Sequence, residues 1–482
     1  MQPGAAANGV FLLADIGSTF TKVVAIDALT ETLLGTALAP TTVATDVRIG
    51  LRQAIARLEA MCGRPLQGSL TRASSSAAGG LRMVAVGFVP GLTALAARYA
   101  CLGAGARVLK SYAFELSSAD LDEINRLAPE ILLLAGGTDG GDHRVILYNA
   151  RALAAGLRFP TAVLVAGNAT ATAEAQALLA ANPLLEVETA ENVLPRLDRL
   201  NLEPARDAVR GIFLRRIVHA RGIDRLEEDG LAQVVMPTPE AVLDGAELLS
   251  TGTATEPGLG DLVVLDIGGA TTDVHSIGVG PGSPGLAKGL LPEPFAKRTV
   301  EGDLGLRVNA ASLLAVAGPA QVAACLDQDG AVTEEGLRAY VGKISASVNH
   351  LPPDPATALM DGALAAAAGA IALERHAGRI ERIPMPGGVV DLQHGKDLTG
   401  FPTVIGTGGI FARGGHAGTI LAAVQWWNAQ TPALTPQAPD LLVDRGYLLF
   451  AAGLLRGIAD DLAIRLLKRT LAPAHPDPQS EI

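Results

Sequence analysis

The sequence has 482 residues, which is too long for one ordinary hydrophobic core and suggests two to four domains. It is 49% hydrophobic but only 4% aromatic, and its surplus of Ala, Leu and Val favours helices packed on buried parallel strands, that is, an α/β fold. The net charge of −11 comes from scattered carboxylates, and no basic run is interleaved with aromatic residues, so nucleic acid is not expected as a partner.

Cysteine usage and the N-terminal segment argue against several other classes of protein. The three cysteines lie far apart and indicate neither a zinc site nor a disulfide framework. No basic segment precedes Phe11–Leu13, and Asp15 interrupts this apolar stretch well before a signal sequence or a membrane span would be complete. The longest alanine-rich run, Ala363–Leu373, would cross only half a bilayer as a helix. We therefore expect a cytoplasmic protein without membrane contact.

The first predicted strand, residues 10–16, leads into a turn that suits an anion. Asp15 lies at the strand end, and the glycine and small side chains that follow let backbone amides approach a phosphate. The ammonium of Lys22, on the returning strand, could reach a β- or γ-phosphate. Taken alone, Asp15 would equally well be a turn residue and Lys22 a solvated strand residue. The predicted phosphate contacts here are Gly17, Ser18, Thr19 and Lys22.

Residues 82–180 alternate strand and helix patterns and predict a doubly wound βαβ subdomain inserted in the first half of the chain. Within it, Gly136–Asp142 follows a predicted strand, and both a third anion site and a simple tight turn are compatible with this loop. Residues 196–222 resemble a pair of basic amphipathic helices. Residues 230–258 resemble a connection rich in Pro, Gly and Thr.

A second loop repeats the first about 250 residues later. Residues 262–267 form another short apolar run that ends in Asp-Ile-Gly, with Asp266 at the strand end and Asp273 on the returning strand. A carboxylate in such a position can hold a magnesium-bound water or orient the attacking water in phosphoryl transfer. Strand-end capping and hairpin stabilisation are the simpler alternatives. The predicted phosphate contacts are Gly268, Gly269, Thr271 and Thr272.

The repetition itself predicts a duplicated domain, because two equivalent hairpins can face one another across a cleft and clamp a phosphate chain. Asp15, Asp266 and Asp273 are the candidate catalytic residues. Asp15 and Asp266 are also the candidate magnesium-organising carboxylates.

Helical patterns follow the second loop at 301–317, 333–349 and 356–375. Glu301 and Asp303 are expected to begin the first of these helices, where nucleotide contact and N-terminal capping explain them about equally well.

The last glycine-rich loop follows the predicted strand Pro402–Ile405. Three glycines in four residues leave bare backbone against which a base or ribose can lie. A helix over 446–471 and a polar tail are expected to close the chain. The predicted adenosine contacts are Gly406, Thr407, Gly408 and Gly409.

In this order, the three loops resemble those of the actin-like ATPase superfamily (ASKHA), which includes actin, the seventy-kilodalton heat-shock chaperones and sugar kinases. Ala14–Lys22 is similar to its first phosphate motif, and Asp266–Asp273 is similar to the chaperones' Asp-Leu-Gly-Gly-Gly-Thr-Phe-Asp. The resemblance implies two ribonuclease-H-like domains around a nucleotide cleft that binds ATP and Mg²⁺. We expect these domains over 1–249 and 250–445, with residues 446–482 forming a helix that returns to the first domain and the tail.

Ser74–Met83, Leu134–Asp142 and Lys297–Gly305 resemble the MutL/GlmL family of glutamate mutase accessory proteins. The resemblance implies an ATP-hydrolysing chaperone, or reactivating factor, that exchanges damaged cofactor in an adenosylcobalamin-dependent mutase. The inserted subdomain lacks the Asp-x-His-x-x-Gly motif that supplies the cobalt ligand in cobalamin-binding domains. We therefore expect it to provide a docking surface rather than a cobalt ligand.

Two other functions are compatible with the same superfamily. A small-molecule kinase would use an additional Asp as the base for a substrate hydroxyl. A filament-forming or scaffold protein would use ATP to control assembly. The sequence contains no Gly-x-x-x-x-Gly-Lys-[Ser/Thr] motif, so a P-loop ATPase is not expected. It does not indicate an oligomeric state.

Overall fold

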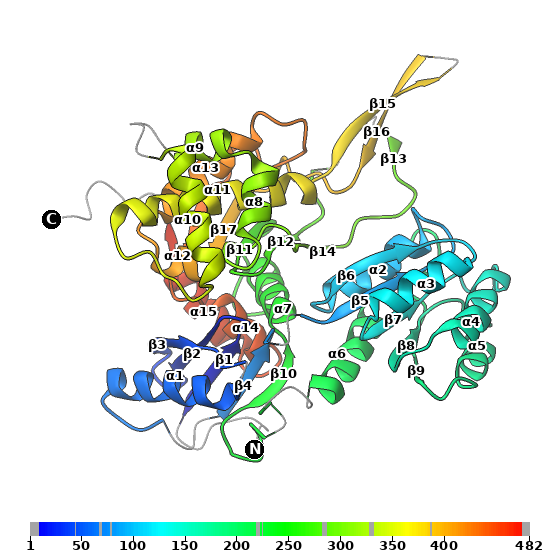
Figure 1. Cartoon of the computed structure of the whole chain (residues 1–482), viewed down its shortest axis with the longest axis horizontal. Helices are drawn as coiled ribbons and strands as arrows, with labels where there is room; N and C mark the ends of the chain where they lie inside the picture. The colour runs from blue at the N-terminus through cyan, green and yellow to red at the C-terminus, as the bar shows by residue number, and fades with distance from the viewer. Residues whose placement is uncertain are drawn as a thin grey trace. The chain divides into compact units, whose positions relative to one another are not determined.

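The structure is a computed structural model of the whole chain, with mixed α and β elements that confirm the predicted α/β class (Figure 1). It describes residues 9–43, 45–66, 70–77, 80–217, 222–223, 225–281, 287–326, 332–385 and 388–474. The chain forms two compact units. Unit 1 comprises Met1–Gly79, Arg221–Ala287 and Arg298–Ile482, and unit 2 comprises Gly80–Ala220 and Lys288–Lys297.

The first sheet of unit 1 carries the first predicted phosphate loop at the end of its central strand. Its strands are β1 (Val10–Ile16), β2 (Phe20–Asp27), β3 (Thr32–Pro40), β4 (Leu70–Ser75) and β10 (Gln233–Pro237). The first three form an antiparallel meander, whereas β4 runs parallel to β1 and β10 runs parallel to β4. β1 is buried along its whole length, as expected for an apolar central strand. Helix α1 (Val47–Cys62) packs on β2 and β3.

The second sheet of unit 1 repeats this arrangement. Its strands are β11 (Leu262–Ile267), β12 (Thr272–Ile277), β14 (Ala296–Glu301), β17 (Thr403–Thr407), β18 (Asp440–Asp444) and β19 (Leu471–Pro473). The order β14-β12-β11-β17-β18 matches β3-β2-β1-β4-β10, and β17 and β18 again continue the sheet in parallel. The strand order thus confirms the predicted repetition: the strand, glycine turn and strand unit occurs in two sheets of the same order.

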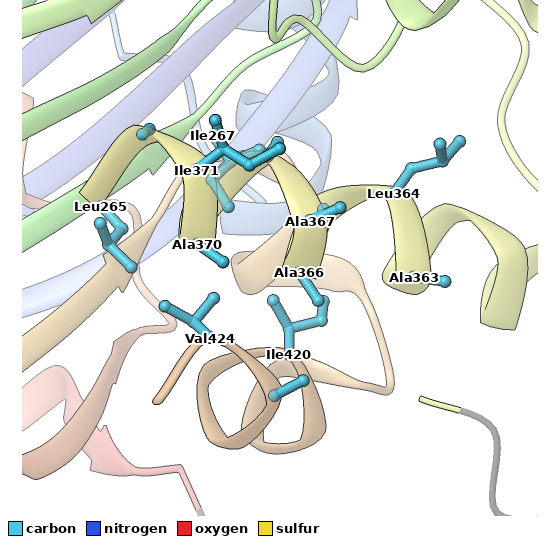
Figure 2. Close-up of a cluster of buried hydrophobic side chains, with 14 of the residues drawn as sticks. Leu265, Ile267, Ala363, Leu364, Ala366, Ala367, Ala370, Ile371, Ile420 and Val424 are labelled. Atoms are coloured by element: carbon cyan, nitrogen blue, oxygen red, sulfur yellow. The ribbon is translucent and has the colours of Figure 1, made fainter. Parts of the chain in front are cut away.

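The helices of the second half pack around the second sheet, with α11 at the centre. They are α8 (Ala310–Ala317), α9 (Pro319–Leu326), α10 (Glu334–Ala346), α11 (Pro355–His376), α12 (Gly409–Arg413) and α13 (Ala417–Asn428). Figure 2 shows the small side chains of α11 between Leu265 and Ile267 of β11 and Val424 of α13. A Cβ atom on Gly369 would lie 3.0 Å from Val424 Cγ2 and 3.2 Å from Ile267 Cδ1. Small residues on α11 thus allow close helix–sheet packing.

Helix α11 agrees with the helical pattern predicted over 356–375 and contains the alanine-rich run. Among the described residues it is the one helix that is long and apolar enough to cross a membrane by length and composition. However, 72% of its most apolar window is buried inside the protein, which fits the core helix of a soluble protein.

A separate small sheet in the order β13-β16-β15 contains a long hairpin that is visible in Figure 1. Its strands are β13 (Ala287–Lys288), β15 (Arg379–Met385) and β16 (Gly388–His394). β15 and β16 are antiparallel.

Unit 2 is built on a fully parallel sheet in the order β6-β5-β7-β8-β9, a doubly wound arrangement of the flavodoxin type. Its strands are β5 (Arg82–Val86), β6 (Arg107–Tyr112), β7 (Ile131–Leu134), β8 (Thr161–Val165) and β9 (Leu185–Thr189). Its helices are α2 (Thr93–Gly103), α3 (Ser118–Leu127), α4 (Arg144–Gly156), α5 (Thr172–Leu179) and α6 (Glu203–Ile217). The unit extends beyond the predicted range of 82–180 because β9 adds a fifth strand and α6 packs on α2.

Two predictions for the segment between the loops are wrong. The described part of 196–222 contains one helix, α6, rather than a pair; Pro204 lies in its first turn, a position that proline favours. Residues 230–258 are not merely a connection, because they form β10 and α7 (Thr238–Thr251). Pro239 lies in the first turn of α7, where its missing N–H costs nothing.

Two further predictions fail in the second half. Glu301 ends β14 rather than beginning a helix, and α8 begins only at Ala310. The predicted helix over 446–471 is two helices, α14 (Leu449–Leu455) and α15 (Asp460–Thr470), separated by a turn in which Gly457 has a φ of +76°. Most of the predicted polar tail lies outside the described residues.

Helices α7 and α14 follow the equivalent strands β10 and β18, and their backbones pack directly against each other. A Cβ atom on Gly245 of α7 would lie 2.0 Å from the carbonyl oxygen of Leu449. A Cβ atom on Gly453 of α14 would lie 1.9 Å from the carbonyl oxygen of Ala241. Any larger residue at either glycine must push the two helices apart.

We predict that Gly245→Ala lowers the free energy of unfolding by about 1–3 kcal/mol, the usual cost of overpacking, despite the better helix propensity of alanine. Urea unfolding followed by circular dichroism would measure the change. Gly342→Ala in α10 is the matched control, because a Cβ atom there meets nothing within 4 Å. It should leave stability unchanged or slightly increased, and equal behaviour of the two variants would contradict the close helix contact.

Candidate functional site

The two predicted phosphate loops are hairpins of the same construction. The amide of Gly17 donates to the carbonyl oxygen of Phe20 at 3.2 Å, and the amide of Gly268 donates to that of Thr271 at 2.9 Å. In register, Asp15 pairs with Lys22 across the first hairpin, and Asp266 pairs with Asp273 across the second. One hairpin thus sets opposite charges side by side, whereas the other sets two like charges side by side.

Both hairpins line one cavity of about 520 Å³ within unit 1, a size typical of small-molecule sites. Most of the predicted site residues border this cavity: Asp15, Gly17, Ser18, Thr19, Lys22, Asp266, Gly268, Gly269, Thr271, Asp273, Gly408 and Gly409. These residues come from strands β1, β2, β11 and β12 and from the loops that follow β1, β11 and β17, so the fold gathers groups that are up to about 390 residues apart in sequence.

The other three predicted site residues, Thr272, Gly406 and Thr407, are not part of the cavity lining. The hydroxyl of Thr272 donates to the carbonyl oxygen of Leu304 at 2.8 Å, and that of Thr407 donates to Asp444 Oδ2 at 3.0 Å. A Cβ atom on Gly406 would lie 2.7 Å from the ring of Phe411. These three residues stabilise the loops through contacts outside the cavity lining.

The carboxylate of Asp15 is buried and has partners on both oxygens. The Thr238 hydroxyl donates to Oδ1 at 2.7 Å, and the Tyr447 hydroxyl donates to Oδ2 at 3.0 Å. The ammonium of Lys22 lies 3.3 Å from Oδ2. Asp15 is therefore fixed in orientation by three groups from three different elements.

Asp273 is also committed to neighbouring donors. The buried guanidinium of Arg298 donates from Nε to Asp273 Oδ1 at 2.8 Å. The Thr271 hydroxyl donates to Oδ2 at 2.9 Å. This buried ion pair neutralises the negative charge beside Asp266 and closes the second hairpin.

Asp266 differs from both of these carboxylates. Within the described parts of the chain, its carboxylate has no recorded hydrogen bond or ion pair, and it borders the cavity. Burial, followed by the nearby charge of Asp273, raises the pKa of Asp266 to about 7, while Lys22 acts in the opposite direction. Asp266 is therefore poised to exchange a proton for a cation near neutral pH.

A second ion pair supports the glycine turn of the second hairpin. The guanidinium of Arg307 binds Asp361 in a bidentate manner, at 2.8 Å to Oδ1 and 2.7 Å to Oδ2. The backbone amide of Arg307 donates to the carbonyl oxygen of Gly269 at 2.8 Å. Among the described residues, no cluster of three or more metal-ligating side chains is present.

Sequence reasoning missed four residues at this site: Thr238, Arg298, Arg307 and Tyr447. Thr238 and Tyr447 reach Asp15 across 223 and 432 positions of sequence, and no local pattern reports such a contact. Arg298 lies in Lys297–Gly305, a segment for which the sequence provides only a family resemblance. Basic residues that pair with buried carboxylates can be identified only once the fold shows which carboxylates are buried and which side chains lie beside them.

The Gly136–Asp142 loop of unit 2 has the internal hydrogen bonding of a tight turn. The side chain of Asn168 accepts from the Gly140 amide at 3.2 Å and donates to the carbonyl oxygens of Gly141 and Asp142, both at 3.1 Å. These contacts account for the loop without an anion.

We predict that the free energy of unfolding of the ligand-free protein decreases as the pH rises from about 4 to about 7. In this range the folded state binds a proton on Asp266 that the unfolded state has already released. Asp266→Asn should remove this contribution and raise the melting temperature at pH 8. Melting curves at pH 5, 6, 7 and 8 would measure it. The exposed Asp440, mutated to Asn, is the control; a wild-type slope in the Asp266 variant would contradict the assignment.

The chain is similar over nearly its whole length to known MutL sequences. The family model described as MutL protein matches residues 11–471. Protein MutL of Clostridium tetanomorphum is 42% identical over 464 residues, which cover 96% of this chain and 99% of that protein.

Solved structures give weaker likenesses. The nucleotide-free structure of acetone carboxylase has 14% identity and a TM-score of 0.41, covering 92% of this chain and 70% of that one. Component A of (R)-2-hydroxyglutaryl-CoA dehydratase from Acidaminococcus fermentans has 10% identity and a TM-score of 0.31. The match covers 96% of this chain and 98% of that one. Neither likeness is strong enough to assign an activity. On the family match and the full-length relative, the chain belongs to the MutL protein family.

Proposed function

We propose that this protein binds and hydrolyses ATP, and that it serves as an accessory protein that reactivates an adenosylcobalamin-dependent mutase of the glutamate mutase type. The observation that supports ATP hydrolysis is the carboxylate of Asp266, the one in the cavity lining with no recorded hydrogen bond or ion pair in the part of the chain that the structure describes, beside two glycine turns and Lys22. Membership of the MutL family supports the accessory role. The proposal places the protein in the cytoplasm and has damaged cobalamin exchanged on the mutase.

In this proposal the two hairpins hold the phosphates through backbone amides, and Lys22 neutralises their charge. The amide donors would come from Ser18, Thr19, Gly269 and Thr271, while the amides of Gly17 and Gly268 close the two turns. The bare backbone at Gly408 and Gly409 receives the adenosine. Thr272, Gly406 and Thr407 contribute by fixing the loops.

Asp266 is the proposed magnesium ligand, because it has an available carboxylate that gives up its proton near neutral pH. Asp15, whose oxygens already accept from Thr238 and Tyr447, contributes through the magnesium-bound waters. Bound Mg²⁺ supplies charge neutralisation for the phosphates. Once deprotonated, Asp266 orients the attacking water, and Asp273 keeps the second hairpin closed through Arg298.

A small-molecule kinase would need a further carboxylate to accept the proton of a substrate hydroxyl. The two additional carboxylates of the cavity lining are held by arginines, Asp273 by Arg298 and Asp361 by Arg307. This arrangement favours water over an alcohol as the phosphoryl acceptor.

We predict that Asp266→Asn retains ATP binding but lowers kcat for hydrolysis by about 100-fold or more, since a positioned electrostatic group is lost while the binding surface remains. Calorimetric titration with Mg-ATP and a phosphate-release assay would measure the two quantities separately. Asp440→Asn should match the wild type in both. An unimpaired rate in Asp266→Asn would remove Asp266 from the mechanism.

The accessory role predicts that a glutamate mutase inactivated by turnover recovers activity when this protein, adenosylcobalamin and Mg-ATP are added together. The expected result is ATP-dependent recovery that is absent with Asp266→Asn. ATP hydrolysis without recovery would leave the ATPase proposal standing and exclude this mutase as the partner.

A further inference from the structure

Tyr447 makes two different contacts with the first phosphate hairpin. Its hydroxyl donates to Asp15 Oδ2 at 3.0 Å, and the Lys22 ammonium lies 3.7 Å from the centroid of its ring. The same ammonium lies 3.3 Å from Asp15 Oδ2. Tyrosine, lysine and aspartate therefore form a closed triangle in which each member contacts the other two.

The backbone of Tyr447 is held in an unusual conformation. Its φ of +52° lies in the left-handed region, which is rare for a bulky residue and persists where the surrounding structure enforces it. The amide of Tyr447 donates to the carbonyl oxygen of Asp444 at 3.2 Å, and the Asp444 side chain accepts from the amides of Leu448 and Leu449 at 2.9 and 3.0 Å. The end of β18 and the start of α14 thus fix the direction of the ring.

The environment keeps the hydroxyl of Tyr447 protonated. The side chain is buried, and burial followed by the charge of Asp15 raises the pKa of Tyr447 well above its usual value. The phenol therefore remains a hydrogen-bond donor to Asp15. The electron-rich face of the ring attracts the ammonium of Lys22, whose side chain is partly exposed and borders the cavity.

We propose that Tyr447 is a positioning residue for nucleotide: it holds the Lys22 ammonium and the Asp15 carboxylate at the places where the phosphates and the magnesium-bound waters are received. This inference rests on the proposed ATP-binding function. It follows from the triangle, because neither Lys22 nor Asp15 can turn away without losing a contact with Tyr447. The ordering of the flexible lysine side chain is then complete before nucleotide binds.

The two contacts can be separated by mutation. Tyr447→Phe keeps the ring beneath Lys22 but removes the donor to Asp15, so ATP affinity should change less than about threefold while kcat falls about tenfold. Tyr447→Leu removes both contacts, so the Kd for ATP should rise at least about tenfold, whereas adenosine, which lacks phosphates, should bind as it does to the wild type. A merely structural role would move both ligands together.

The test compares wild type, Tyr447→Phe, Tyr447→Leu and a control, Tyr148→Leu, which changes an exposed tyrosine of unit 2. ATP and adenosine affinities are measured by calorimetry and kcat by phosphate release. The rate at which an amine-acylating reagent modifies Lys22 in protein without nucleotide is read by peptide mass spectrometry. We expect Lys22 to react several-fold faster in Tyr447→Leu, and at the wild-type rate in Tyr447→Phe and the control.

Equal labelling rates of Lys22 in wild type and Tyr447→Leu would overturn the proposal, whatever the measured affinity for ATP. Faster labelling with unchanged ATP affinity would also overturn it, because Lys22 would then be shielded but not positioned for phosphate. If Tyr447→Leu does not fold, the unequal effects on Kd and kcat in Tyr447→Phe decide the question. Wild-type protein that binds no ATP would refute the proposed function itself, and calorimetry distinguishes that case from the others.

Discussion

The structure of the site depends on a cross-strand pairing of charges at the ends of two equivalent strands. In the first hairpin Asp15 lies opposite Lys22, so the buried carboxylate has an opposite charge beside it. In the second hairpin Asp266 lies opposite Asp273, and two adjacent carboxylates in a buried place require a cation or a proton. Arg298 supplies positive charge to Asp273 alone. Asp266 has no such partner recorded among the described residues, and this is why we propose that the cavity receives a cation and its ligand.

The surrounding fold gives hydrogen-bond partners and positive charges to two of the three carboxylates and leaves the third available. Asp15 and Asp273 both accept from hydroxyls and lie beside cations, so they serve as rigid parts of the two hairpins. Asp266 keeps its carboxylate open, and its pKa, raised to about 7 by burial and by Asp273, means that a proton occupies it below neutral pH. A magnesium ion would replace that proton and restore attraction across the cavity. Binding of Mg-ATP is thereby expected to change the electrostatics between the hairpins, as well as to fill space.

The local parts of this site were accessible from the sequence, and the long-range parts were not. An apolar run ending in Asp-Ile-Gly predicts a buried strand and a glycine turn, and its repetition predicted the duplicated sheets that the strand order confirms. Proline and threonine around Thr238 suggested a connection, but burial against the first sheet makes that segment a strand and a helix. The ring of Tyr447 reaches Asp15 because α14 returns to β1, a tertiary event without a local signal.

Helices α7 and α14 connect the site to the rest of unit 1. α7 begins with Thr238, which donates to Asp15, and α14 begins just after Tyr447, which donates to the same carboxylate. The two helices touch through Gly245 and Gly453, where no side chain separates their backbones. A shift of Asp15 therefore acts on the starts of both helices at once, and a contact this close allows sliding or rotation but little separation. An accessory protein that uses ATP to act on a partner needs such a link, since hydrolysis has a mechanical effect only where the phosphate site and a movable element share residues.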